Sequence, residues 1–71
     1  MSDLLGRTGT VVQPIRGRQP GEVAVKLASG FVEHLLAVSA EPVPLGATVL
    51  IVGRDPETRT LLVEPWSYAT D

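Results

Sequence analysis

The chain has 71 residues, a formal net charge of −2, a single histidine and no cysteine. This length suits one domain of marginal stability, and the lack of cysteine excludes disulfides and thiolate metal sites. The acidic balance argues against general binding to nucleic-acid phosphates, which requires a clustered positive surface. No apolar run approaches the roughly 18 residues of a membrane span, and the first residues lack the pattern of a signal peptide. We therefore expect one cytoplasmic domain over residues 1–71, with its core in 6–65 and a tail at 66–71.

Short apolar segments separated by prolines and glycines predict β-strands with turns between them. The third segment is also compatible with a short helix, because several of its residues have fair helix propensity, and the sequence leaves that alternative open. Five strands with a long connection between the third and the fourth are typical of a small OB-type or SH3-like barrel. We predict an all-β fold, a small five-stranded OB-like barrel. The expected strands are residues 9–15, 22–27, 31–38, 48–53 and 60–64.

Alternation within these segments identifies the side chains that would fill such a barrel, since successive strand residues point to opposite faces. Every second residue along these strands is mostly a branched apolar residue, which suits a barrel interior. The predicted core consists of Val11, Ile15, Val23, Val25, Leu27, Leu35, Ala37, Val49, Ile51, Leu61 and Val63.

More apolar strand residues are present than one small barrel needs. We expect Leu50, Val52 and Leu62 to be cross-strand neighbours on the outside of the last hairpin, where they would form an apolar patch of a few hundred Å². Trp66 joins them as a candidate contact, because large aromatic rings dominate binding hot spots. Two alternatives stay open: a loop or the tail covers the patch, and Trp66 folds over an open barrel end. The other surplus residues are Leu36 and Val38.

Chemistry-bearing side chains are few and scattered. His34 is the one base suited to neutral pH, and Glu33 points to the opposite face of a strand. We therefore predict no catalytic, metal or cofactor site, and no enzyme. The alternative function is nucleic-acid binding by an OB fold through a basic cluster made of Arg16, Arg18 and Lys26. The scarcity of aromatic residues on the second and third strands, where such folds stack bases, weakens this alternative.

Several segments of the chain form a recognisable series, although each is only a turn or strand signal. They are Leu5-Gly6-Arg7-Thr8-Gly9, Pro14-Ile15-Arg16, Gly21-Glu22-Val23, Ala37-Val38-Ser39, Leu45-Gly46-Ala47-Thr48-Val49 and Leu62-Val63-Glu64-Pro65. In order and spacing this series resembles the C-terminal soluble OB-fold domain of the NfeD-like family.

The resemblance implies a five-stranded barrel that acts as an interaction module without catalytic residues. Domains of this family usually follow membrane helices, which this sequence lacks, and they are associated with membrane scaffolds of the flotillin and stomatin type and with membrane-protease regulation. Family members often carry a tryptophan on the third strand, where this chain has Leu35. The expected partner is such a scaffold or a second copy of the chain, and the expected location is the cytoplasm, peripheral to the membrane through the partner.

Overall fold

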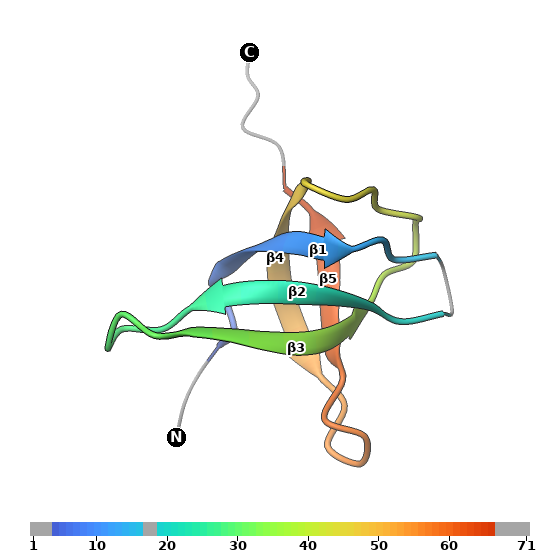
Figure 1. The fold of residues 1–71 in the computed structure, drawn as a ribbon. Helices are drawn as coiled ribbons and strands as arrows, with labels where there is room; N and C mark the ends of the chain where they lie inside the picture. The colour runs from blue at the N-terminus through green and yellow to red at the C-terminus, as the bar shows by residue number, and fades with distance from the viewer. Residues whose placement is uncertain (1–3, 17–18, 67–71) are drawn as a thin grey trace.

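The computed structural model describes residues 4–16 and 19–66. Its five strands close into a barrel with the order β1-β2-β3-β5-β4 (Figure 1). The predicted all-β, five-stranded barrel is confirmed, with strand ends displaced by one or two residues. The helical alternative for the third segment is wrong, because this segment pairs along its length with the second strand. The strands are β1 (Thr8–Gln13), β2 (Gly21–Lys26), β3 (Val32–Val38), β4 (Thr48–Arg54) and β5 (Leu61–Pro65).

The barrel is made of two crossed parts, as Figure 1 shows. Strands β1, β2 and β3 form an antiparallel meander, and the β4–β5 hairpin crosses it at a steep angle. Antiparallel pairing of β1 with β4 closes one side. The other side is closed by a short parallel pairing of β3 with β5, which joins only Ala37 to Leu61 and Val38 to Leu62.

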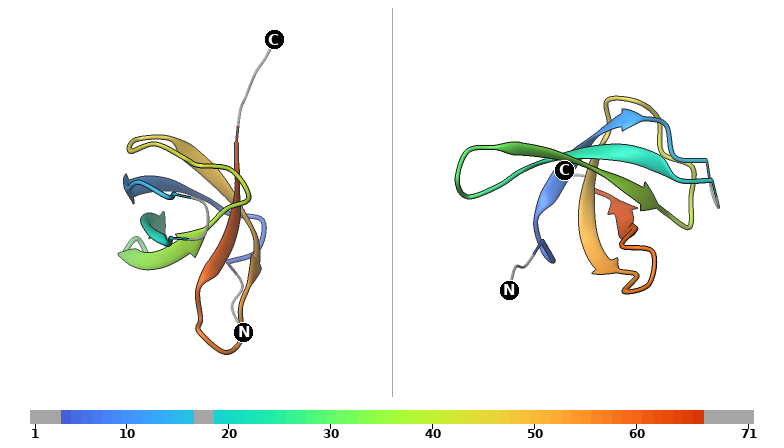
Figure 2. Two further views of the ribbon diagram at one scale, coloured as in Figure 1. Left: turned by 90° about the vertical axis from the view of Figure 1, so that its right-hand side faces the viewer. Right: turned by 60° about the horizontal axis from the view of Figure 1, so that its bottom comes forward.

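The β2–β3 hairpin is longer than the barrel wall, and its tip projects away from the body of the domain (Figure 2). The tip is a tight turn in which the Gly30 amide donates to the Leu27 carbonyl at 2.9 Å and the Leu27 amide donates to the Phe31 carbonyl at 2.8 Å. Gly30 has φ +98°, a conformation that favours glycine. Leu27 was predicted in the core, and this was wrong: the residue is only half-buried because the turn begins beyond the barrel.

Ten apolar side chains fill the barrel interior, and nine of them belong to the predicted set. Leu35 was also predicted there, but it is half-buried and packs against the edge of the core. Val43 is the unpredicted member. It lies in the connection between β3 and β4, where its backbone forms two 2.9 Å hydrogen bonds with Ile15. The buried set is Val11, Ile15, Val23, Val25, Ala37, Val43, Val49, Ile51, Leu61 and Val63.

Candidate interaction surface

The outer face of the β4–β5 hairpin is shaped by an irregularity in β4. Ile51 pairs with Val63 and Gly53 pairs with Leu62, so Val52 is an extra residue in β4 with no partner of its own in β5. Such a bulge bends the strand and re-aims the side chains next to it. Because Ile51 points into the core, Val52 points outward, and 47% of its surface is exposed.

Val52 is one member of a small apolar cluster on this face. Leu62 is 40% exposed and stands opposite Gly53, whose missing side chain leaves room for it: a Cβ built on Gly53 would lie 3.1 Å from Leu62 Cδ1. On its other side Leu62 is paired with the half-buried Val38 of β3. We call Val38, Val52 and Leu62 the outer apolar patch. It runs across three neighbouring strands, β3, β5 and β4.

The structure does not bring all four predicted contact residues together. Leu50 stands opposite Glu64 of β5 and Thr8 of β1 instead of opposite Leu62, and it is half-buried. Trp66 follows β5, and its amide donates to the Thr48 carbonyl at 3.0 Å, so it lies at the far end of β4 from Val52. The expectation that Leu50, Val52 and Leu62 are cross-strand neighbours was therefore wrong for Leu50, because the register of the hairpin before the bulge places it opposite Glu64, two residues beyond Leu62 in β5.

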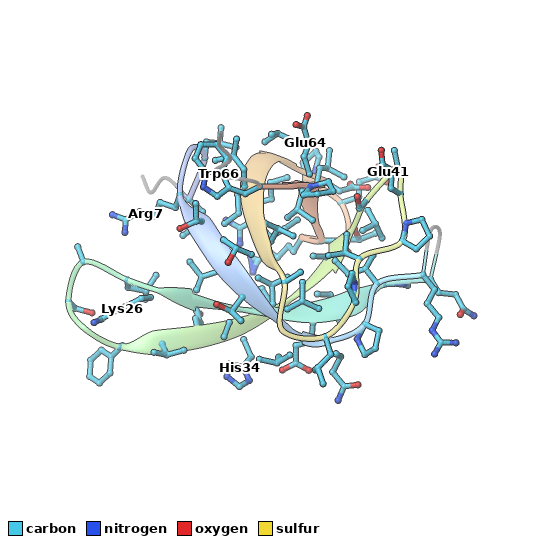
Figure 3. The ribbon with its side chains drawn as sticks, turned by 90° about the horizontal axis from the view of Figure 1, so that it is seen from above. Arg7, Lys26, His34, Glu41, Glu64 and Trp66 are labelled. Atoms are coloured by element: carbon cyan, nitrogen blue, oxygen red, sulfur yellow. The ribbon has the colours of Figure 1, made fainter. Side chains whose placement is uncertain are left out.

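The loop that follows β3 does not cover the outer apolar patch, since Val52 and Leu62 remain exposed. This loop instead borders an open pocket of about 400 Å³ beside the end of β5, lined by Ser39, Ala40, Glu41, Val63, Glu64 and Pro65. Glu41 and Glu64 lie on the same side of the molecule in Figure 3. These two glutamates form an acidic rim near the apolar patch, because Glu64 lies two residues after Leu62 on the same face of β5 and Glu41 lies three residues after Val38.

His34 lies on the outer face of β3, where its Nδ1 is 2.9 Å from the Glu22 Oε2 of β2 (Figure 3). Both side chains are substantially accessible to solvent. Within the described residues no group of three or more histidines and carboxylates could hold a metal ion. In the described part of the chain this solvated pair has no third polar partner, and such a pair offers no arrangement for nucleophilic or metal-assisted chemistry.

The basic residues of the alternative function do not converge in the part of the chain that the structure describes. Arg16 precedes β2 and Lys26 is the last residue of β2, so the length of this strand, about 17 Å, separates them. Arg18 lies outside the described residues. The cation next to Lys26 is Arg7, whose Nη1 donates to the Lys26 carbonyl at 3.3 Å.

Comparison with protein families gives a match to the NfeD C-terminal domain over residues 8–64. The chain belongs to the NfeD C-terminal domain family. The matched residues cover the five strands of this NfeD domain except Pro65, the last residue of β5, and the resemblance inferred from the sequence is confirmed. A search of curated proteins finds no match. Within residues 4–16 and 19–66, no helix has the length and apolarity needed to cross a membrane.

Two solved structures resemble this NfeD domain along most of its length. One is the soluble domain of the NfeD protein YuaF from Bacillus subtilis, with a TM-score of 0.74 and 32% sequence identity over 89% of this chain and 74% of that one. The other is the C-terminal domain of stomatin operon partner protein 1510-C from Pyrococcus horikoshii, with a TM-score of 0.71 and 27% identity over 90% of this chain and 89% of that one.

Proposed function

We propose that this NfeD domain is a non-catalytic interaction module that binds a protein partner through the outer apolar patch. The observation that carries the proposal is the exposure of Val52 and Leu62 side by side on the outer face of a hairpin, in a domain whose core is already filled by other residues. Contiguous apolar patches that remain in water on a monomer often mark interaction sites when they reach a few hundred Å². The solvated His34–Glu22 pair supports a role without chemistry.

The partner that we propose is a stomatin- or flotillin-type membrane scaffold. The support is the family membership, together with a relative of 27% identity that is named a stomatin operon partner protein. Association with such a scaffold would keep the domain in the cytoplasm beside the membrane. The acidic rim formed by Glu41 and Glu64 predicts that the partner surface carries basic residues around an apolar centre, because complementary charges steer association and fix orientation.

The test compares binding of the wild type, Val52→Asp and Leu45→Asp to a purified stomatin-like protein by biolayer interferometry. Leu45 is the matched control, since it is 63% exposed in the loop before β4 and lies outside the patch. A carboxylate at position 52 would be buried unpaired in the complex, while an exposed site tolerates it in the free domain. We expect Val52→Asp to weaken binding at least about tenfold and Leu45→Asp to leave it unchanged.

The proposal for the patch fails if Val52→Asp and the wild type bind equally well. The proposal for the partner fails if the wild type does not bind the stomatin-like protein. Sedimentation velocity would then show whether a second copy occupies the patch, because a wild-type dimer that Val52→Asp dissociates assigns the patch to self-association. Circular dichroism of each variant tests whether the fold is retained.

A further inference from the structure

One edge of β3 is open along most of the strand. On one side β3 pairs with β2 from Val32 through Ala37. On the other side β5 pairs with Ala37 and Val38 only, and no strand of the described residues pairs with Val32–Leu36. The open segment belongs to the hairpin whose tip projects away from the β4–β5 hairpin in Figure 1.

The register identifies the backbone groups on this edge. Successive residues of an antiparallel strand direct their N–H and C=O groups alternately toward and away from the partner strand. The Leu27 amide bonds to the Phe31 carbonyl at the start of the pairing, so Glu33 and Leu35 direct their groups toward β2. Val32 and His34 therefore direct their N–H and C=O groups to the open edge.

This edge lacks lysine, proline and bulges, which are three of the features that prevent a strand from pairing with another chain, and the charge of Glu33 is the one such feature it has. Residues 32–36 contain none of the first three, and Glu33 is the one carboxylate among them. On the outer face Val32 and Leu36 are apolar and accessible, 56% and 53% exposed, and the exposed His34 lies between them. Phe31, the adjoining residue at the tip, is 74% exposed.

We propose that an extended peptide segment of a partner protein adds to this edge as a further strand. Backbone hydrogen bonds to Val32 and His34 would supply affinity, and alternate side chains would supply specificity, as in other cases of strand addition. The segment would carry apolar residues opposite Val32 and Leu36, and a basic residue opposite Glu33. This inference rests on the proposed function in that the partner is a protein, and it adds a second contact with a different mode of binding.

A peptide fits this edge better than a second copy of the chain does. In a symmetric pairing of two β3 strands about His34, the tip residues 30 and 31 of one copy would lie alongside Ala37 and Val38 of the other. That position is already taken by β5. A short peptide ends before it and meets no such obstacle. An anionic membrane surface is a poorer fit, since the Glu33 carboxylate would face it.

The experiment titrates the ¹⁵N-labelled domain with the synthetic peptide acetyl-Val-Val-Thr-Lys-Val-amide, aligned antiparallel so that its lysine is opposite Glu33. We expect saturable amide shifts centred on Val32 and His34, with a Kd of about 1 mM or tighter, and slower hydrogen exchange at the Val32 amide. His34→Pro removes the open-edge N–H without breaking the pairing to β2 and should abolish the shifts. The matched variant His34→Ala removes the imidazole but keeps the N–H, and it should bind as the wild type does.

The inference is overturned if the peptide shifts no β3 amide, or if His34→Pro and His34→Ala bind it equally well. It is also overturned if the Val32 amide becomes protected with rising protein concentration alone, which would indicate a second copy, or with anionic vesicles but not with the peptide. None of these results depends on Val52. Failure here would leave the patch-mediated function standing, and failure of the Val52→Asp test would leave this edge unaffected.

Discussion

The close approach of β1 to β2 inside the barrel predicts a strong response to a single methyl group at Gly9. A Cβ built on Gly9 would lie 2.6 Å from Val23 Cγ1, 3.0 Å from the Ala24 carbonyl oxygen and 3.2 Å from Val25 Cγ2. Both valines are completely buried, and β-branched side chains have few alternative rotamers. The third neighbour is backbone. Gly9→Ala therefore forces β1 and β2 apart.

The cost of Gly9→Ala follows from two opposing effects. Overpacking a filled core destabilises a protein by about 1–3 kcal/mol, whereas replacing glycine restricts the unfolded chain and returns about 0.4–1 kcal/mol. We expect a net loss of about 1–2 kcal/mol in the free energy of unfolding, which for a domain of this size lowers Tm by roughly 5–15 °C. The total stability of such a domain is only about 4–10 kcal/mol, so the loss is readily measured.

Gly53→Ala is the matched control, because the nearest atom to its added Cβ is the end of the partly exposed Leu62 side chain. That side chain is free to rotate toward solvent, so we expect a change within about 0.5 kcal/mol. Urea unfolding followed by circular dichroism measures both variants. A Gly9→Ala domain as stable as the wild type, or an equal loss in Gly53→Ala, would refute the account of how tightly the strands pack.

Two further predictions concern the loops. Val43→Ala should lower the free energy of unfolding by about 1–3 kcal/mol, because it removes buried methyl groups from the core. Leu45→Ala nearby should have little effect. Equal urea midpoints for the two variants would contradict the core role of Val43. Asp55→Ala should cost about 1 kcal/mol, because the Asp55 carboxylate accepts hydrogen bonds from the amides of Glu57 at 2.9 Å and Thr58 at 3.4 Å. Asp55→Asn keeps an acceptor and should recover most of that loss in thermal melts, and no recovery would disprove the capping role.

The barrel could be predicted from the sequence because its strands alternate. Val23, Val25 and their counterparts on other strands face one way at every second position, and the structure buries them as expected. Val43 could not be found in this way, since it lies in a proline-rich connection without a period. Its burial depends on a long-range bridge to Ile15, for which neither segment carries a local signal.

The candidate surface was predicted less accurately, for two physical reasons. The register of the β4–β5 hairpin places Leu50 opposite Glu64, and a bulge then places Gly53, not Val52, opposite Leu62. The sequence offers only Gly53 as a hint of this bulge. The β2–β3 hairpin also extends beyond the barrel, which removes Leu27 from the core and opens the edge at Val32–Leu36. How far a hairpin extends beyond its barrel depends on where the other strands pair to close the barrel. No single segment of the sequence encodes that pairing.

The most direct test of the central claim is a methyl NMR measurement with a soluble paramagnetic agent, made on the domain alone and then with a stomatin-like partner. Val52 and Leu62 are exposed in the free domain, so their methyl signals should be attenuated there and protected in the complex, while Leu45 stays attenuated in both. Protection confined to other methyl groups, with Val52 and Leu62 still accessible in the complex, would contradict the claim that the outer apolar patch is where the partner binds.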